Sequence, residues 1–279
     1  MALTAARQNL ALLPSDKAFF FYGRRSDLRM LSIMREPAMD TLTISAASGM
    51  RARMESLDML ANNMANADTS GYKTDREFYN LYVSPEAEAS EGSPATLPVI
   101  ERPWTDFSQG SLRPTGSPLD LALTGKGFFA VDGPSGSLYT RNGNFRVSAA
   151  GRLVTAEGYP VRAVDGAKLQ VDPSGAVEVS ADGTVNQNGQ TLGQIEIADF
   201  SDQSTVTKQG ASYFRSAAAV QPASGVEVAQ GKLESSNVGP AESAVRLVSV
   251  MRQFEMLQKA VTLGGQMNQS AVEIARVAS

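Results

Sequence analysis

Two apolar stripes with helical spacing, one near each end of the chain, constrain the fold more than any other feature. Both follow steps of 3, 4, 3, 4 and 3 residues, the spacing of the a and d positions of a coiled coil. Each stripe needs an apolar partner. The simplest prediction is therefore that the two helices pair, and ordinary core helices of a bundle are the alternative. The first stripe, between Thr41 and about Ala65, is Ala47, Met50, Met54, Leu57, Ala61 and Met64, and the second is Leu247, Val250, Phe254, Leu257, Val261 and Gly264.

Between the stripes the pattern changes to short β-type runs. From about Asp120 to Phe200, segments such as LALTGKGFFAV, LYTR and LGQIEIADF alternate with turn signals such as DGPSG, NGN and SADG. Frequent turns with no intervening helical segment are typical of an all-β domain of hairpins. We therefore predict an α+β fold, in which long N- and C-terminal helices pair as a coiled-coil-like layer around a central all-β domain of short strands and hairpins.

The same patterns divide the chain into six segments. They are an atypical N-terminal extension (1–38), an N-terminal helix and extended segment (39–83), a linker rich in Pro, Ser, Ala and Glu (84–100), the central β domain (101–200), an irregular to extended return segment (201–238) and a C-terminal helix (239–279). Pro240 and Glu242 suit the first turn of that last helix.

The N-terminal extension differs in charge from the rest of the chain. It holds six Lys and Arg against three Asp and Glu, a net of +3, so the remainder of the −4 chain carries −7. Its apolar run, AFFFY, is too short for a secretory signal. We expect no cleaved signal peptide, and we expect the ordered protein to begin near Met39, with the extension disordered or a mis-assigned start.

Two missing residue types narrow the range of functions. The sequence has no cysteine, which removes disulfides and thiolate chemistry, and no histidine, the commonest general base and metal ligand. The net charge of −4 gives no basic footprint for nucleic acid. We therefore expect no enzyme, no cofactor, no metal site, no nucleic-acid partner and no small-molecule substrate.

Individual motifs support that expectation. GKG at 125–127 lacks the third glycine of a dinucleotide loop, and GPSGS at 133–137 has no histidine to activate its serine. Glu86, Glu88 and Glu91 lie in the linker, where nothing raises a carboxyl pKa for glycoside chemistry. Trp104 could stack on a sugar, which leaves a peptidoglycan-binding or peptidoglycan-cleaving module as the alternative from a different class.

The stretch LANNMANADTSGYK, residues 60–73, ends the first helix with three asparagines. Asparagine competes for backbone hydrogen bonds and is a mediocre helix former. We interpret the stretch as a helix exit, in which Asp68 to Gly71 make a turn and Tyr72 and Lys73 start an extended segment. The amides of Asn62, Asn63 and Asn66 then either cap their own chain or bond a neighbouring subunit.

Three motifs in order resemble one family, the bacterial flagellar rod and hook proteins. LANNMANADTSGYK is similar to its N-terminal signature, GKGFFAVDGPSGSLYTRNGNFRVSAAGRLVTAEGYPV to its central block, and LESSNVGPAESAVRLVSVMRQFEMLQKAV to its C-terminal signature. The similarity runs from Met39 to the end. MDTLTISAASGM and MRQFEM resemble the proximal rod branch more than the distal one, whereas the GFF segment is compatible with the distal branch. Met64, Ala67 and Asp68 depart mildly from the usual pattern.

The resemblance implies a structural subunit that is exported unfolded by the flagellar type III apparatus, without cleavage of a signal, and polymerises into a helical rod across the periplasm. Its partners would be itself, other rod proteins and the export apparatus, with the P-ring or peptidoglycan as possible surroundings. The implied subunit contacts are Met50, Met54, Leu57, Ala61, Asn62, Asn63, Met64, Asn66, Gly71, Tyr72, Leu247, Val250, Phe254, Leu257 and Val261. The implied β core is Gly127, Phe128, Phe129, Tyr139, Arg141, Phe145, Leu153, Val154, Gly158 and Tyr159.

Overall fold

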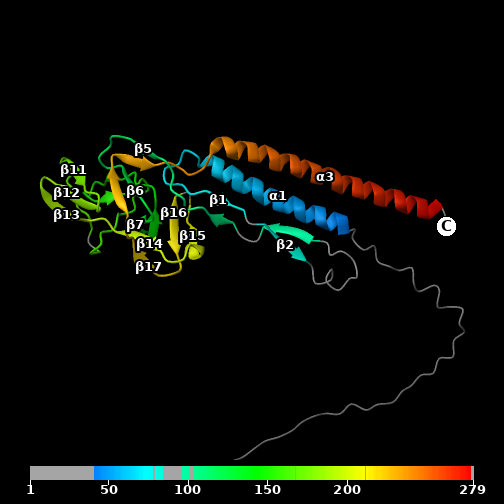
Figure 1. The fold of residues 1–279 in the computed structure, drawn as a ribbon, viewed down its shortest axis with the longest axis horizontal. Helices are drawn as coiled ribbons and strands as arrows, with labels where there is room; N and C mark the ends of the chain where they lie inside the picture. The colour runs from blue at the N-terminus through cyan, green and yellow to red at the C-terminus, as the bar shows by residue number, and fades with distance from the viewer. Residues whose placement is uncertain are drawn as a thin grey trace, which may run out of the picture. The chain divides into compact units, whose positions relative to one another are not determined.

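Two long helices from opposite ends of the chain lie side by side in the computed structural model (Figure 1). The structure describes residues 41–77, 79–83, 96–100, 103–166, 168–210 and 212–277. Helix α1 spans Thr41–Ala65 and helix α3 spans Pro240–Val277. The predicted pairing of the terminal helices is confirmed. The predictions for residues 1–38, for the start near Met39 and for most of the linker lie outside the described residues.

Helix α3 presents the predicted stripe to α1. Val250 and Gly264 are buried, and Leu247, Phe254, Leu257 and Val261 are half-buried on the same face. Pro240 begins the helix, and Glu242 lies in its first turn, as expected. The C-terminal stripe was therefore predicted in the correct phase.

Helix α1 buries a different face from the predicted one. Its buried residues are Ala46, Gly49, Ala52, Ser56, Leu60 and Asn63, whereas Met54 and Ala61 of the predicted stripe are exposed. The buried stripe lies one residue earlier along the chain, a rotation of about 100°. The reason is close approach: a Cβ added at Gly49 would lie 3.3 Å from Leu257, so α3 packs on the small residues of α1.

Short antiparallel strands make up the rest of the fold. They are β1 (Asp75–Arg76), β2 (Tyr79–Val83), β3 (Thr96–Ile100), β4 (Trp104–Thr105), β5 (Leu112–Pro114), β6 (Leu121–Thr124), β7 (Phe128–Gly133), β8 (Gly136–Thr140), β9 (Arg146–Val147), β10 (Leu153–Val154), β11 (Val177–Val179), β12 (Thr184–Gln187), β13 (Gln190–Gln194), β14 (Ile197–Phe200), β15 (Val206–Lys208), β16 (Tyr213–Ser216), β17 (Val220–Pro222), β18 (Glu227–Gln230) and β19 (Lys232–Glu234), with a 3-10 turn at Gln203–Thr205.

The largest sheet has the strand order β15-β16-β8-β7-β14-β17. Strands β11, β12 and β13 form a second sheet, and two-stranded pairs join distant segments, such as β18 with β6 and β19 with β5. The segment 201–238, which we expected to be irregular to extended, supplies the strands β15 to β19. Its strands escaped prediction because each is only three or four residues long and pairs with a distant partner. The end of the predicted linker, 96–100, is likewise a strand, β3.

Consecutive residues of β7 fill two separate cores, because side chains alternate across a strand. Phe129 packs in a large cluster with Leu121, Val131 and Phe145. Phe128 packs in a smaller aromatic cluster with Phe107, Phe200 and Phe214, with ring centroids 4.7–5.5 Å apart. The GFF segment therefore holds the two sides of the main sheet together.

Candidate functional site

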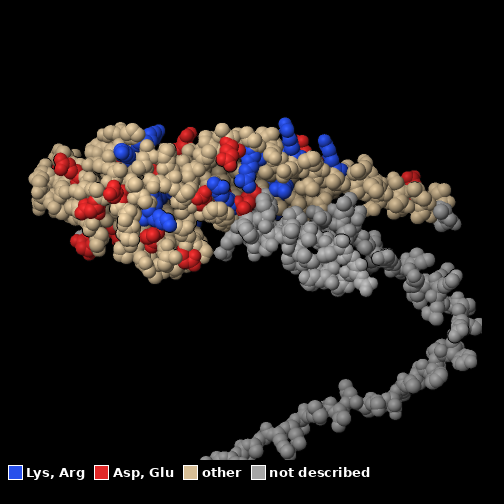
Figure 2. Space-filling model, viewed as in Figure 1, with Lys and Arg blue, Asp and Glu red and all other residues tan. Residues whose placement is uncertain are grey.

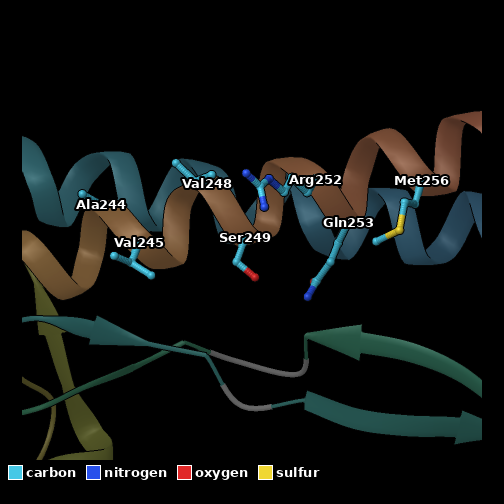
Figure 3. Close-up of a pocket in the computed structure, with 7 residues that line it drawn as sticks. All are labelled: Ala244, Val245, Val248, Ser249, Arg252, Gln253 and Met256. Carbon is cyan, nitrogen blue, oxygen red and sulfur yellow. The ribbon is translucent and has the colours of Figure 1, made fainter.

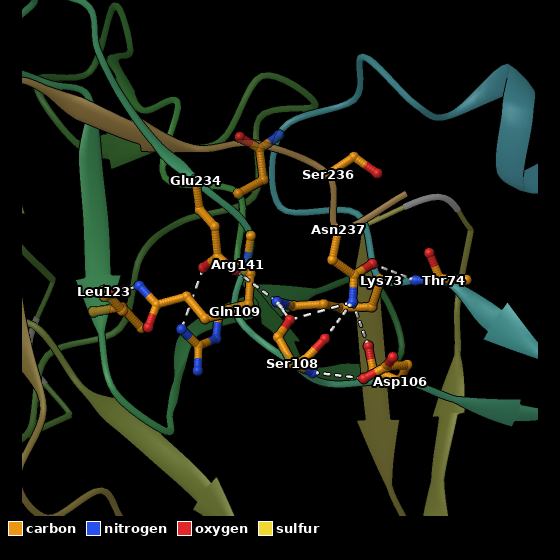
Figure 4. A network of polar contacts seen from close by, with 12 residues as sticks. Lys73, Thr74, Asp106, Ser108, Gln109, Leu123, Arg141, Glu234, Ser236 and Asn237 are labelled. Atoms are coloured by element: carbon orange, nitrogen blue, oxygen red, sulfur yellow. Dashed lines mark hydrogen bonds and ion pairs between the residues drawn. The ribbon is translucent and has the colours of Figure 1, made fainter. Parts of the chain in front are cut away.

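A buried ion cluster lies where three segments meet: the chain that follows α1, the end of β8, and strand β19, which leads to α3 (Figure 4). We call this meeting point the junction. Glu234 of β19 is fully buried. Its Oε1 accepts hydrogen bonds from Lys73 Nζ at 2.6 Å and from the Gly110 N–H at 2.9 Å, and its Oε2 lies 3.2 Å from Arg141 Nη1. One carboxylate thus compensates two buried cations that are far away in the sequence.

The surroundings of the cluster strengthen this arrangement. Burial lowers the pKa of Lys73 below its ordinary value, while Glu234 opposes that shift. Arg141 also donates to the Gly125 carbonyl at 2.6 Å, and its guanidinium lies 5.1 Å from the centroid of the Phe128 ring. Since an unpaired buried charge is costly, the cluster requires all three residues together.

Asn237 bridges the same junction from the C-terminal side (Figure 4). Its Oδ1 accepts from the Thr74 N–H at 2.7 Å, and its Nδ2 donates to the Asp106 carbonyl at 2.8 Å. The chain leaving α1 is thereby tied to the chain entering α3, and both are tied to the segment before β5.

The asparagines at the end of α1 bond their own chain. Asn63 is buried; its Nδ2 donates to the Asp75 carbonyl, and its Oδ1 accepts from the Asp75 N–H and the Tyr72 hydroxyl. Asn62 also accepts from Tyr72, and Asn66 Nδ2 donates to the Asn62 carbonyl. These are the intramolecular bonds of the first interpretation, and bonds from the same amides to a neighbouring subunit stay a prediction.

Gly71 is buried in this exit segment and donates its N–H to the Glu234 carbonyl at 2.8 Å. Burial, with the nearby Asp75 carboxylate, raises the pKa of Tyr72 well above its ordinary value. The Tyr72 hydroxyl therefore stays protonated and remains a donor. Asn63, Gly71 and Tyr72, which we expected to be subunit contacts, have their contacts inside the chain in this structure.

Asp106, beside the cluster, gives the junction a pH dependence. Burial alone would raise its pKa, but hydrogen bonds from Ser108 and the Arg76 guanidinium at 2.9 Å together hold the pKa below its ordinary value. A carboxyl with a depressed pKa in the folded state stabilises the fold above its unfolded pKa of about 4, and this contribution is lost as the pH falls through the folded pKa.

We expect Asp106→Asn to be less stable than the native protein at pH 7, and we expect the difference to be smaller at pH 3, in urea unfolding followed by circular dichroism. Asp58→Asn, at an exposed carboxylate of α1, is the matched control and should behave like the native protein at both pH values. A stability difference for Asp106→Asn that is unchanged between pH 7 and pH 3 would contradict this role.

Helix α3 has a second apolar face on the side away from α1. Its exposed residues are Val245, Val248, Met251, Met256, Leu263, Met267, Ile274 and Val277. Part of this face lines a groove of about 580 Å³ (Figure 3), where Gln253 Oε1 finds no hydrogen-bond donor among the described residues. On the face drawn in Figure 2, acidic and basic side chains are interspersed, and the distal part of α3 carries few of either.

The predicted helix residues divide between two environments. Leu247, Val250, Phe254, Leu257 and Val261 face α1 of their own chain. The methionine-rich stripe of α1 is instead more open: Met54 and Ala61 are exposed, and Met50, Leu57 and Met64 are half-buried. This second set leaves apolar surface on α1 that α3 does not cover.

The residues predicted as β core are placed within the strands and turns of the β region. Phe128, Phe129, Tyr139, Phe145, Leu153 and Val154 are buried, as are Gly127 and the ion-cluster residue Arg141. Tyr159 is half-buried and packs edge to face against Tyr213, whereas Gly158 is an exposed turn residue with φ 92°. Sequence reasoning missed Glu234, although it lies in the LESSNV motif, because nothing local marks a buried partner for residues 93 and 161 positions away.

Several kinds of site are absent from the part of the chain that the structure describes. No group of three or more His, Asp or Glu there has the arrangement of a metal site. Neither α1 nor α3 has an apolar stretch long enough to span a bilayer. The described residues instead show paired terminal helices that are fastened to a β region by a buried ion cluster.

Three family models match the chain in order. The model "Flagella basal body rod protein" matches residues 45–73, "Flagellar hook protein FlgE/F/G D1 domain" matches 122–211, and "Flagellar basal body rod FlgEFG protein C-terminal" matches 229–274. Lys73, Arg141 and Glu234 each lie in a different one of these segments. The ion cluster is therefore the point where the three matched segments meet in space.

Curated relatives agree over most of the chain. The rod protein FlgF of Caulobacter vibrioides is 34% identical over 238 residues, covering 84% of this chain and 97% of the relative. FlgF of Mesorhizobium japonicum is 35% identical, covering 75% and 87%. FlgG of Caulobacter vibrioides is 32% identical, covering 82% and 97%. The chain belongs to the flagellar basal-body rod protein family, and it is a structural subunit and not an enzyme.

Proposed function

We propose that this chain is a subunit of the proximal part of the flagellar rod and that it polymerises there through faces of α1 and α3. The proximal position rests on the similarity to the two FlgF proteins, at 34% and 35% identity. A distal position is the alternative, and it rests on the similarity to FlgG at 32% identity. Partners would be further copies of the chain and other rod proteins.

One observation carries the polymerisation proposal: α3 has two apolar faces, and α1 covers only one of them. Exposed apolar surface of this extent marks an interaction site on a soluble protein. On α1, Met54 and Ala61 are exposed, Met50, Leu57 and Met64 beside them are half-buried, and Asn62 and Asn66 lie at the end of this stripe. When two different patches of one subunit bind head to tail between copies, and the rotation from copy to copy does not close a ring, the copies form a helical assembly.

The proposal also gives the chain a route and a location. It is exported through the flagellar type III apparatus without a cleaved signal peptide and becomes part of the periplasmic rod, where the P-ring and peptidoglycan are its surroundings. The absence of cysteine removes any disulfide that would hinder the passage of an unfolded chain.

Negative charges on the second apolar face of α3, the one that α1 does not cover, should abolish assembly. We expect the double variant Val248→Glu, Met256→Glu to leave the thermal unfolding midpoint almost unchanged, because both residues are exposed. The same variant should fail to enter purified basal bodies, because burying two unpaired carboxylates at a subunit contact is costly. Incorporation is measured by immunoblotting of basal bodies from cells that carry the variant as their only copy.

Two further variants define the result. Gln258→Glu, on an exposed flank of α3, should enter basal bodies normally. Removal of residues 240–279 should abolish incorporation completely. If the double variant or the truncation is incorporated at native levels, α3 is not an assembly element and the proposal is wrong.

A further inference from the structure

A cleft of about 380 Å³ lies between three turns of the β region, away from both helices and from the ion cluster. Its walls come from the turn between β7 and β8, from the turn after β10 and from the hairpin of β15 and β16. The volume is within the range of roughly 300–1,000 Å³ that small-molecule sites have. Neither the assembly faces nor the junction uses this cleft.

Two tyrosines form one wall of the cleft. Tyr159 and Tyr213 pack edge to face, with ring centroids 5.5 Å apart and an interplanar angle of 73°. The Tyr213 hydroxyl donates a hydrogen bond to the Glu157 carboxylate, which holds that carboxylate at the rim of the cleft. A carboxylate has about four acceptor positions, so Glu157 keeps others for a ligand.

Two polar groups at the cleft have unused hydrogen-bonding capacity. Within the described residues, the Arg215 guanidinium has no hydrogen-bond acceptor or acidic partner, although the residue is half-buried. The Gln209 side-chain amide is exposed at the same cleft and has no partner among the described residues. A half-buried guanidinium without an acceptor is a poor way to stabilise a fold, because part of its hydration is lost without replacement.

We propose that this cleft binds a carbohydrate, with a sugar ring against Tyr159 and its hydroxyl groups bonded to Glu157, Arg215 and Gln209. The amphipathic tyrosine rings suit the mixed surface of a pyranose, which has apolar C–H groups on its faces and hydroxyl groups at its edge. A carboxylate, an amide and a guanidinium together accept from and donate to such hydroxyl groups. Phosphorylated ligands fit less well, because the single cation is accompanied by the Glu157 carboxylate.

The proposal is independent of the role in the rod and differs from the sugar contact considered for Trp104. That tryptophan lies in β4 and takes no part in the cleft. Only the tertiary structure reveals the cleft, since Glu157 lies in the turn after β10 and Arg215 lies in β16, more than fifty residues further along the chain.

The test is titration of the full chain with a tetramer of N-acetylglucosamine, a tetramer of glucose and tetra-alanine, by calorimetry and saturation-transfer NMR. We expect saturable binding of at least one sugar and none of the peptide. Tyr159→Ala and Arg215→Ala should each weaken binding about tenfold or more, in line with the loss of a charged hydrogen bond or an aromatic surface. Tyr159→Phe should retain binding, because it keeps the ring.

Arg146→Ala is the matched control, since Arg146 is exposed in β9 and does not line the cleft. Its affinity should equal that of the native protein. Circular dichroism checks that each variant is folded. Absence of sugar binding, binding of tetra-alanine alone, or sugar binding that survives both Tyr159→Ala and Arg215→Ala would overturn the proposal.

Discussion

Replacing Glu234 with glutamine is expected to destabilise the fold by about 3–5 kcal/mol, the usual cost of removing one partner from a buried ion pair. The variant keeps the shape of the side chain but leaves Lys73 and Arg141 buried without a counter-charge. Urea unfolding followed by circular dichroism measures the loss. Hydrogen exchange should show faster opening at the end of α1 and the start of α3, because the cluster joins both to the β region.

Glu227→Gln is the control for charge removal as such. Glu227 is an exposed glutamate in β18, and its substitution should change stability by no more than about 0.5 kcal/mol. A Glu234→Gln variant as stable as Glu227→Gln would show that the ion cluster does not hold the junction together.

Replacing Gly71 with alanine is the second change with a large expected effect. Gly71 has φ 70°, where a side chain costs about 1–2 kcal/mol, and an added Cβ would lie only 2.3 Å from the Asn142 backbone nitrogen. Moving the backbone to relieve that overlap adds roughly 1–3 kcal/mol. We therefore expect a total loss of about 2–5 kcal/mol in the same unfolding experiment.

Gly116→Ala separates the two contributions. Gly116 has nearly the same backbone conformation, φ 74°, but no atom lies within 4 Å of an added Cβ. Its substitution should cost only the conformational part, about 1–2 kcal/mol. Equal losses for the two variants would mean that the close contact between Gly71 and the Asn142 backbone does not affect stability.

Local patterns were enough to predict the types of element. The 3-4 spacing in 247–264 predicted both the helix and the face that it presents, because apolar residues dominate that stripe. The hairpins between Asp120 and Phe200 were visible because their turns carry Gly, Asn and Asp at short intervals. The strands of 201–238 were not visible, because strands of three or four residues hold too few side chains to show an alternating pattern.

In the segment that follows α1, part of the structure could be predicted from the motif and part could not. Its sequence correctly indicated a helix end and a turn, since asparagine and glycine favour both. Whether the amides bond their own chain or a neighbour depended on where Asp75 and Tyr72 lie in space. That position is decided by the junction and not by the motif.

The sequence by itself determined that two terminal helices would flank a β region, because periodicity and turn residues are local properties of a chain. Only the tertiary structure decided which face of α1 is covered. The methionine stripe is the more apolar one, but Gly49 and the small residues beside it let α3 approach more closely. Only the tertiary structure also brought Lys73, Arg141 and Glu234 together, because a buried charge is matched by position in space and not by distance along the chain.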